Sequence, residues 1–566
     1  MIIEKDLRVA MRDGVELSVD LFRPDSDERV PALLSISPYS KDVQSLPLPS
    51  GMGKAMEYGA VEAGDPRQIV AAGYAHVIPD PRGIGKSDGI FYNWFSEQEQ
   101  WDGYDLVEWA AAQPWCNGNV GMVGVSYFAV IQYLVAAQQP PHLKAIFPYD
   151  GWGDTYRDTM YHGGIPSIFG FRIHGATMAN ETASWVKDRY KPEEVTEAIE
   201  RLLADEATNY RMSPQIVAML MARKTREECL DYLVLRDDGP FYWERSPRTK
   251  NHLIQVPTYL ASELHSYTVS MHLPGATTWG WEQITAPKKL TLLPWQSTLP
   301  GGAGERPYDQ WHEEIFRWFD YWLKGIDTGI MDEARVRIWV RGAEQWLETD
   351  EWPLLSKTNW ERLFLRAGGS LAGDAPNGDE PTDPLHYAAA LPTFGPPLSP
   401  RPAILTYETA PFESDVRIIG PLALYLNASV TSGDADFIVR VQDVGADGEA
   451  FTLTRGWLKA SHRAVDKAQS KPYRPFHPHT NPSPVPEGEV IQYDIEIQPI
   501  ANLFKAGTRL RLEIWPCDWM SPKDEYEWPL FWGYSHHVPY GKDVDYTIHH
   551  SAEHPSHLLV PVVRDE

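Results

Sequence analysis

The feature that most constrains this chain is the stretch from Val120 to Ala129, which reads Val-Gly-Met-Val-Gly-Val-Ser-Tyr-Phe-Ala. It begins as a short apolar run typical of a buried strand, and a run typical of a helix follows at 130–137. A serine between strand and helix, with Gly124 two residues earlier, fits a nucleophile elbow, although the last glycine of that motif is missing. The elbow predicts that Ser126 is a nucleophile and that the Tyr127 backbone N–H faces a developing oxyanion.

Composition narrows the class of protein. The chain has 566 residues, enough for about two to four domains. Its net charge of -27 argues against nucleic acid and anionic membrane surfaces as partners. It has no run of about twenty apolar residues that would span a membrane, and its first residues lack the apolar core of a signal peptide. Three widely spaced cysteines favour a reducing compartment without disulfides, so we expect a cytoplasmic protein.

Strand and helix patterns alternate around the elbow. Apolar runs typical of strands occur at 31–37, 75–80 and 145–150, and a helical pattern covers 99–113. This alternation predicts an α/β fold with a parallel sheet and helices on both faces. The first of these strands runs into Tyr39, at the place where a hydrolase with such an elbow carries its second oxyanion donor. We therefore expect the Tyr39 phenol to donate a hydrogen bond there.

Several segments that occur in one order carry a resemblance to a known family. They are Met11–Gly14, Pro38–Tyr39, Pro81–Ser87, Asp102–Trp109, Gln113–Gly121 and Gly124–Tyr127. Together they resemble the cocaine esterase and X-Pro dipeptidyl-peptidase (CocE/NonD) family of serine hydrolases, which includes α-amino-acid ester hydrolases. The resemblance covers nearly the whole chain. It implies an α/β-hydrolase core with a helical cap over the active site.

The sequence departs from the family at both partners of the serine. The position at which the resemblance expects the catalytic aspartate holds Ser266, and the family pattern Pro-Trp-x-His ends here in Ser297. A serine hydroxyl is a weak nucleophile until a base takes its proton, so hydrolysis would need a relocated histidine. His272 and His265 follow the strand that usually carries the acid, and we expect one of them to act as the base.

Other side chains enter as weaker or supporting candidates. His312 begins the next helix and is a weaker candidate for the base. Asp150 and Asp154 follow the strand after the elbow, and Glu263 lies at the end of a later strand. Any of these carboxylates could orient a relocated imidazole, and we name Asp150 as the candidate catalytic acid.

Beyond Pro402 the sequence changes to short alternating strands separated by turns. This pattern favours a β-sandwich, and the resemblance implies a jelly roll. We therefore expect four segments: the first part of an α/β-hydrolase core at 1–151, a helical cap at 152–251, the second part of the core at 252–355, and a jelly-roll domain at 356–566.

Histidine pairs in this C-terminal region need a separate interpretation. They are His477 with His479, His536 with His537, and His549 with His550. No carboxylate or cysteine set is spaced to complete a ligand shell around these pairs. We therefore expect the histidines to be loop residues that bind no metal, and we expect no cofactor.

The leading interpretation is a serine-dependent acyl hydrolase, an esterase or amidase, or an acyltransferase. It would act on a small, apolar ester or amide through an acyl-Ser126 intermediate. Because Ser266 and Ser297 stand at the usual acid and base positions, two alternatives stay open. One is a non-hydrolytic enzyme such as a lyase, isomerase or cyclase, and the other is a ligand-binding protein with a degenerate triad. The resemblance also leaves a homo-oligomer open.

Overall fold

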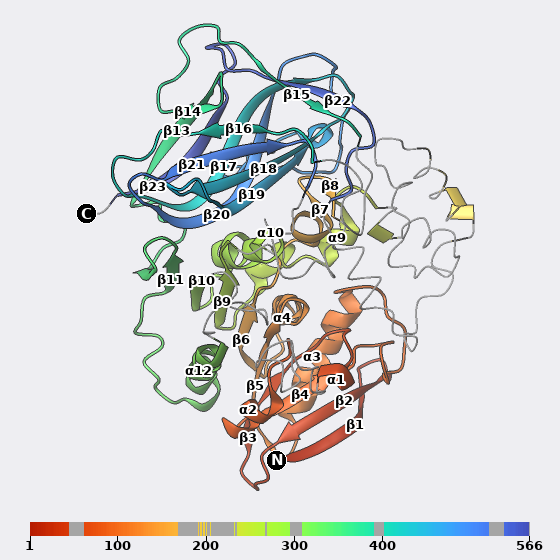
Figure 1. The fold of residues 1–566 in the computed structure, drawn as a ribbon. Coiled ribbons are helices and arrows are strands. Elements are labelled where there is room, and N and C mark those ends of the chain that lie inside the picture. The colour runs from red at the N-terminus through yellow and green to blue at the C-terminus, as the bar shows by residue number, and fades with distance from the viewer. Residues whose placement is uncertain are drawn as a thin grey trace.

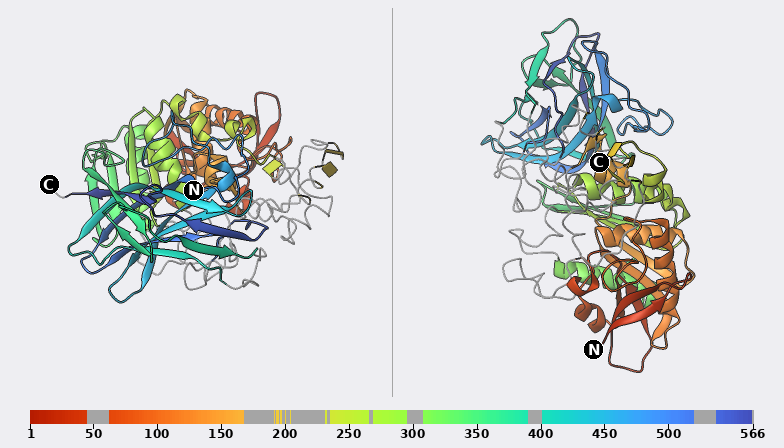
Figure 2. Two further views of the ribbon diagram at one scale, coloured as in Figure 1. Left: turned by 90° about the horizontal axis from the view of Figure 1, so that it is seen from above. Right: turned by 90° about the vertical axis from the view of Figure 1, so that its right-hand side faces the viewer.

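The computed structural model describes residues 1–44, 62–167, 231–232, 235–265, 269–294, 308–389, 401–519 and 537–564, with isolated residues between 191 and 204. These ranges form two parts (Figure 1). One part, coloured red to green, combines a sheet with helices, and the other, coloured green to blue, consists mainly of strands. Seen from the side, the two parts stack along the long dimension of the molecule (Figure 2).

The first part is built on a mixed sheet of ten described strands. In spatial order they are β1 (Ile2–Ala10), β2 (Glu16–Arg23), β4 (Ala75–Pro79), β3 (Val30–Leu34), β5 (Cys116–Val125), β6 (Leu143–Tyr149), β9 (Thr258–Glu263), β10 (Lys288–Leu293), β11 (Val336–Val340) and β12 (Gln345–Thr349). The strands from β4 to β11 are parallel, and antiparallel strands flank them on both sides. The carboxyl ends of the parallel strands therefore meet at one edge, where loops can bring functional side chains together.

Helices cover both faces of this sheet. They are α2 (Pro66–Ala71), α3 (Glu97–Ala111), α4 (Tyr127–Ala137) and α12 (Tyr308–Phe319). The side chains of β5 alternate between the two faces: Met122 belongs to the core that includes α3 and α4, and Val123 to the core that includes α2 and α12. A strand buried on both faces reads as a continuous apolar run, as the sequence around the elbow does.

Capping residues fix where two of these helices begin. The Ser96 hydroxyl accepts a hydrogen bond from the Glu99 N–H at the start of α3. The Asp65 carboxylate accepts one from the Arg67 N–H at the start of α2, where Pro66 occupies the first turn. Both arrangements satisfy backbone donors that a helix N-terminus otherwise leaves unpaired, so the sequence sets these boundaries locally.

A group of short elements lies between the sheet and the all-strand part (Figure 1). They are η2 (Thr155–Met160), β7 (Tyr161–His162), β8 (Ile165–Pro166), α9 (Pro240–Glu244), η4 (Pro247–Thr249), η5 (Asn251–Leu253), α10 (Val269–Pro274), η6 (Gly275–Gly280) and α11 (Trp281–Gln283). Most of the cap predicted at 152–251 lies outside the described residues. The remaining short elements are α1 (Lys41–Gln44), η7 (Asp320–Lys324) and η8 (Ala460–His462).

Among its described residues, the second part contains only strands apart from η8. They are β13 (Thr358–Arg366), β14 (Ser370–Ala372), β15 (Asp383–Tyr387), β16 (Leu405–Glu408), β17 (Val416–Val430), β18 (Asp436–Val444), β19 (Ala450–Lys459), β20 (Ile491–Phe504), β21 (Arg509–Trp515), β22 (Val544–Ile548) and β23 (His557–Val563). The ladder runs β17-β20-β19-β18-β21-β16-β14-β13-β23 and returns from β23 to β17. The all-strand domain expected from the sequence is present, and its ladder closes on itself, so we call it the barrel.

The two parts share a hydrophobic core. Ile419, Ala501 and Leu503 of the barrel belong to the same buried cluster as the sheet and its helices. Arg341, just after β11, continues this contact, because its N–H donates to the Ala501 carbonyl at 3.1 Å and its carbonyl accepts from the Leu503 N–H at 2.8 Å. In the part of the chain that the structure describes, no helix is both long and apolar enough to cross a lipid bilayer.

Candidate active site

The turn between β5 and α4 holds Ser126 in an uncommon backbone conformation. Its φ is 60° and its ψ is -115°. Gly124 precedes it with φ 135°, and a Cβ at that position would lie 2.4 Å from the Phe128 Cβ and 3.0 Å from the Glu62 carbonyl oxygen. A positive φ at a residue other than glycine costs about 1–3 kcal/mol and is found mostly at functional sites. The geometry is that of a nucleophile elbow at the carboxyl edge of the sheet.

One histidine reaches the serine. The Nε2 atom of His272, on α10, lies 3.3 Å from the Ser126 Oγ. The His272 ring is stacked with Trp152, with ring centroids 6.4 Å apart and planes inclined by 19°. Burial lowers the pKa of His272 to about 3, so the ring is a neutral imidazole, and in the tautomer with its proton on Nδ1 the Nε2 atom can accept a proton. Its Nδ1 atom is buried and has no hydrogen-bond partner in the structure as described.

Asp150, the predicted acid, is engaged elsewhere. It follows β6 with a φ of 50°. Its Oδ1 accepts hydrogen bonds from the Ser262 hydroxyl at 2.8 Å and from the Glu263 N–H at 3.0 Å, both at the end of β9. The structure thus directs this carboxylate to β9, and the His272 Nδ1 remains without it. Asp154 forms ion pairs with Arg157 at 2.9 Å and with Arg248 at 2.5 Å, so it is also committed.

His265 points away from the serine. Its Nδ1 lies 3.0 Å from the Leu453 carbonyl and its Nε2 lies 3.1 Å from the Ala501 carbonyl, both in the barrel. Of the two histidines predicted from the sequence, the structure therefore brings His272 to Ser126 and places His265 at the junction with the barrel. Ser266, Ser297 and the side chain of His312 lie outside the described residues.

The two predicted oxyanion donors lie beside the elbow. The Tyr39 ring packs edge-on against Tyr127, with centroids 5.8 Å apart, and against Phe128 at 6.2 Å. Burial, with a smaller contribution from Glu62, raises the pKa of Tyr39 well above its ordinary value, so the phenol keeps its proton. Tyr127 is the first residue of α4, and its backbone N–H therefore has no acceptor within the helix.

A carboxyl group under the elbow holds Tyr127 in place. The Tyr127 hydroxyl donates to Glu99, on α3, at 2.8 Å, and the Phe95 N–H donates to the same carboxyl at 2.8 Å. Burial raises the pKa of Glu99 to about 8, although these hydrogen bonds act in the opposite direction. The Phe95 ring stacks on Tyr127 with centroids 4.1 Å apart. These contacts with Glu99 and Phe95 hold the start of α4 in place, and with it the predicted donor N–H.

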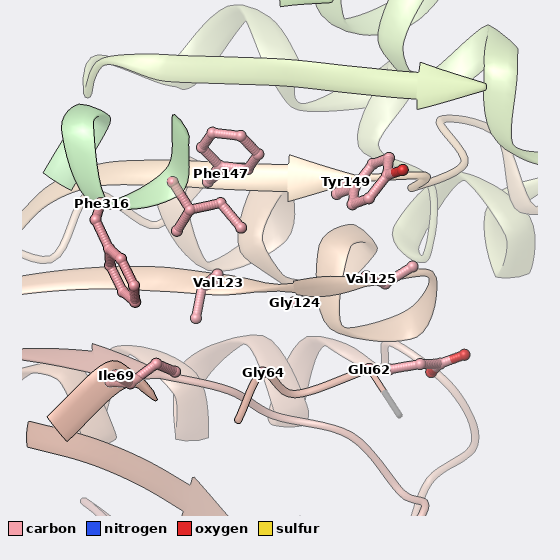
Figure 3. A pocket seen from close by; sticks show the side chains of 10 residues that line it. Glu62, Gly64, Ile69, Val123, Gly124, Val125, Phe147, Tyr149 and Phe316 are labelled. Carbon is pink, nitrogen blue, oxygen red and sulfur yellow. The ribbon is translucent and has the colours of Figure 1, made fainter. Parts of the chain in front are cut away.

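Glu62 lies next to the elbow, where the sequence analysis did not place it. Its carbonyl accepts the Val125 N–H at 3.0 Å, so it lies next to the residue that precedes Ser126. Its side chain lines a pocket whose other walls are mainly apolar, with Val123, Phe147 and Phe316 among them (Figure 3). Glu62 stands in an Ala- and Gly-containing stretch that matches no motif, and no signal in the sequence marks it as functional.

A second histidine arrangement lies where the first part meets the barrel. His537 contacts the Asp518 carboxylate through Nδ1, and its Nε2 lies 2.8 Å from the Nδ1 of His162. The other nitrogen of His162 lies 2.8 Å from the Asp158 carbonyl. Within the described ranges, no group of three or more His, Cys, Asp or Glu side chains is arranged to hold a metal ion.

Comparison with known proteins identifies the class. The X-Pro dipeptidyl-peptidase (S15) family matches residues 13–297, and the X-Pro dipeptidyl-peptidase C-terminal non-catalytic domain matches residues 328–559. The chain belongs to this family of serine hydrolases, which confirms the resemblance found in the sequence.

Individual relatives agree with this assignment. The chain is 26% identical to cocaine esterase of a Rhodococcus species over 99% of both chains. It is 28% identical, over 89% of both chains, to a Mycobacterium bovis protein that carries the name of a serine esterase. A crystal structure of a CocE/NonD family hydrolase from Staphylococcus aureus has a TM-score of 0.77 at 24% identity and covers 100% of this chain and 94% of that one. The last comparison shows a shared fold.

Proposed function

We propose that this protein is a serine-dependent acyl hydrolase in which Ser126 is the nucleophile and His272 is the general base. The observation that carries the proposal is the 3.3 Å separation between the Ser126 Oγ and the His272 Nε2. A base must lie within hydrogen-bond reach of the proton it takes, and such contacts are often long in an enzyme without substrate. The Tyr39 phenol and the Tyr127 N–H are the proposed oxyanion donors.

The order of the strands supports the finer fold assignment. The sheet runs β1-β2-β4-β3-β5-β6-β9-β10, with the elbow after its central strand β5. We assign residues 1–151 and 252–355 to an α/β-hydrolase core, 152–251 to a cap and 356–566 to a jelly-roll domain. In this arrangement the serine stands between β5 and α4, at the carboxyl edge of the sheet.

In the first half of the reaction, the Ser126 Oγ bonds to the substrate carbonyl carbon while the His272 Nε2 takes the hydroxyl proton. The tetrahedral intermediate then collapses, and that proton passes to the departing alcohol or amine. In the second half, water attacks the acyl-serine as His272 accepts one of its protons. Ser126 leaves with that proton, and the carboxylic acid is released. If an alcohol or amine replaces water, the same steps transfer the acyl group.

The surroundings of Ser126 and His272 support our choice of substrate class. His272 is stacked with Trp152, which in turn packs against Phe95 at 5.4 Å and Trp94 at 6.1 Å. Apolar aromatic walls favour a small, apolar ester or amide. Relatives named as esterases and as cocaine esterase are compatible with this choice. Nothing in the described site favours a non-hydrolytic reaction, so hydrolysis is the function we propose.

We also propose that the protein works in the cytoplasm on a small-molecule substrate. Cys116 and Cys517 are free, buried thiols, which suits work in the cytoplasm. The net charge of -27 favours a small-molecule substrate over nucleic acid or an anionic membrane, and a homo-oligomer stays open.

The test is covalent labelling of the serine. We expect a fluorophosphonate to add one adduct to the wild type by intact mass, and none to Ser126→Ala. A small sulfonyl fluoride serves as a second probe, because it can pass an entrance that is too narrow for the fluorophosphonate. If neither probe labels the wild type, Ser126 is not an activated nucleophile and the proposed function is wrong.

A further inference from the structure

Glu99 is a buried acid whose hydrogen-bond partners are neutral. It lies on α3 and is 5% exposed. Its carboxyl group accepts the Tyr127 hydroxyl at 2.8 Å and the Phe95 N–H at 2.8 Å, and among the described residues it forms no ion pair with a cation. A glutamate is almost never fully buried unless a cation pairs with it. The burial of Glu99 against a tyrosine and a backbone N–H therefore calls for a role at the residues it contacts.

The loop before α3 supplies one of these partners, and its backbone is strained. Asn93 has a φ of 80° and Phe95 a φ of 57°, both in the left-handed region. The Asn93 Oδ1 accepts the Trp94 N–H at 2.7 Å, which supports this turn. Such conformations are costly for residues other than glycine and occur mainly at functional sites. Here they direct the Phe95 N–H to Glu99, while the Phe95 ring stacks on Tyr127 with centroids 4.1 Å apart.

The same loop also reaches the base side of the site. The Phe95 ring packs edge-on against Trp152, with centroids 5.4 Å apart, and the His272 ring is stacked with Trp152. Trp152 is 1% exposed, so close packing restricts its orientation. Contacts therefore run from Glu99 through Phe95 and Trp152 to the imidazole. A second, shorter path is the hydrogen bond between Glu99 and Tyr127, whose backbone N–H is a proposed oxyanion donor.

We infer that Glu99 is a positioning residue of the proposed hydrolase, which holds the Tyr127 N–H on the oxyanion side and, through the aromatic contacts, the His272 ring on the base side. This inference rests on the proposed function. Glu99 acts without touching the reacting atoms, because a displacement of about 1 Å at a group that does touch them can cost about 10²-fold in rate. One acid that orients both groups therefore affects the rate more than the binding of substrate.

Truncation of Glu99 should lower the rate of the folded enzyme. We expect Glu99→Ala to lower kcat for p-nitrophenyl butyrate by about 10²-fold, with Ser126→Ala as the blank, because both groups lose their common support. KM should change by less than about threefold, since the affected contacts strengthen in the transition state. A purely structural role would instead lower the melting temperature and leave kcat unchanged at temperatures where circular dichroism shows a folded protein.

Glu99→Gln tests for rescue by the conservative variant. Burial raises the pKa of Glu99 to about 8, so the wild-type group is mainly a neutral acid at pH 7, and a glutamine has the same shape. Its carbonyl can accept the Phe95 N–H, and its amide can donate to the Tyr127 oxygen. We therefore expect Glu99→Gln to keep a kcat within about threefold of the wild type.

Two tyrosines on α4 provide a matched pair. Tyr127→Phe keeps the ring and the backbone N–H and removes only the hydroxyl that contacts Glu99, so we expect kcat to fall about tenfold. When this change is combined with Glu99→Ala, kcat should fall no further than in Glu99→Ala alone, because the two residues act through one contact. Tyr133→Phe is the control, since Tyr133 is 1% exposed on the same helix and its hydroxyl has no partner among the described residues. This control should keep the wild-type kcat.

The outcomes are distinguishable. If Ser126 takes no probe, the proposed function fails and the inference fails with it. If Ser126 is labelled and turns over substrate, but Glu99→Ala keeps the wild-type kcat, the inference alone is wrong. The inference is equally wrong if Tyr127→Phe keeps the wild-type kcat, or if Tyr133→Phe lowers kcat as much as Tyr127→Phe does. These last two results decide the matter even if Glu99→Ala does not fold.

Discussion

Buried imidazoles lie both at the elbow edge of the sheet and at the junction with the barrel, and they differ in their hydrogen-bond partners. At the elbow, the His272 Nε2 faces Ser126 and its Nδ1 has no partner among the described residues. At the junction, His537 has a carboxylate, Asp518, on one nitrogen and His162 on the other. Burial opposes the ionisation of Asp518, yet His537 lowers its pKa below the ordinary value. We therefore expect the loss of a partner to affect stability at the paired imidazole, and we propose that the imidazole beside Ser126 takes part in proton transfer.

Removing the nucleophile gives the largest expected effect. We expect Ser126→Ala to lower kcat for p-nitrophenyl butyrate by at least about 10⁴-fold, because the acyl intermediate can no longer form. Steady-state kinetics with the purified variant check this. If the variant retained wild-type turnover, the reaction would take place at another residue, and His272 would not be the imidazole that serves it.

Removing the unpaired imidazole comes next. We expect His272→Ala to lower kcat/KM by about 10²- to 10⁴-fold and to slow fluorophosphonate labelling of Ser126. His265→Ala is the matched control, because the two His265 nitrogens face barrel carbonyls and neither faces the serine. If His265→Ala slows labelling as much as His272→Ala, the structure has assigned the wrong histidine.

Among the described residues no group pairs with the His272 Nδ1, and this should also show in the acid limb of the pH profile. His272 must be neutral to accept a proton, and burial holds its pKa at about 3. As the pH falls, we therefore expect kcat/KM to persist below pH 5, whereas an ordinary histidine would become protonated near its usual value of about 6.5. Stopped assays from pH 4 to 7 measure the limb, and circular dichroism confirms that the protein stays folded. A midpoint near 6.5 would contradict the comparison.

Breaking the paired imidazole should affect stability and leave the reaction intact. We expect Asp518→Asn to lower the free energy of unfolding by about 3 kcal/mol, since it removes one partner of a buried pair. Chemical denaturation measures the loss, and the labelling rate of Ser126 should not change. Asp545→Asn is the control. Its pair with His386 is exposed, with side chains 66% and 64% accessible, and should contribute at most about 1 kcal/mol.

Much of the fold could be predicted from local patterns. The strand runs expected at 31–37, 75–80 and 145–150 appear as β3, β4 and β6, each within a few residues. The helix expected at 99–113 appears as α3 at Glu97–Ala111. The closure of the barrel could not be predicted, because it depends on β17 pairing with β20 on one side and with β23 on the other, and both lie far along the chain. Such long-range pairing leaves no periodic signal in the strand itself.

The site could be predicted only in part, for reasons that individual residues make clear. The elbow is a local motif, so Ser126 and Tyr127 could be placed from the sequence. His265 and His272 follow the same strand, and only the path of the chain separates them. A φ of 61° at His265 accompanies its turn toward the barrel, while α10 carries His272 over the serine. The position of Glu62 beside the elbow could not be predicted, because the hydrogen bond from the Val125 N–H to the Glu62 carbonyl joins segments far apart in the chain.

The closing of the barrel through β23 also has a consequence for the order in which the chain can fold. During synthesis the sheet of the first part is complete once β12 has emerged, whereas β13 and β17 wait for β23, more than a hundred residues later, to pair with both. Until then each of these strands presents an open edge, the kind of surface on which nascent chains associate. A chain that ended before His557 would keep the edges of β13 and β17 open, so the closure of the barrel depends on β23.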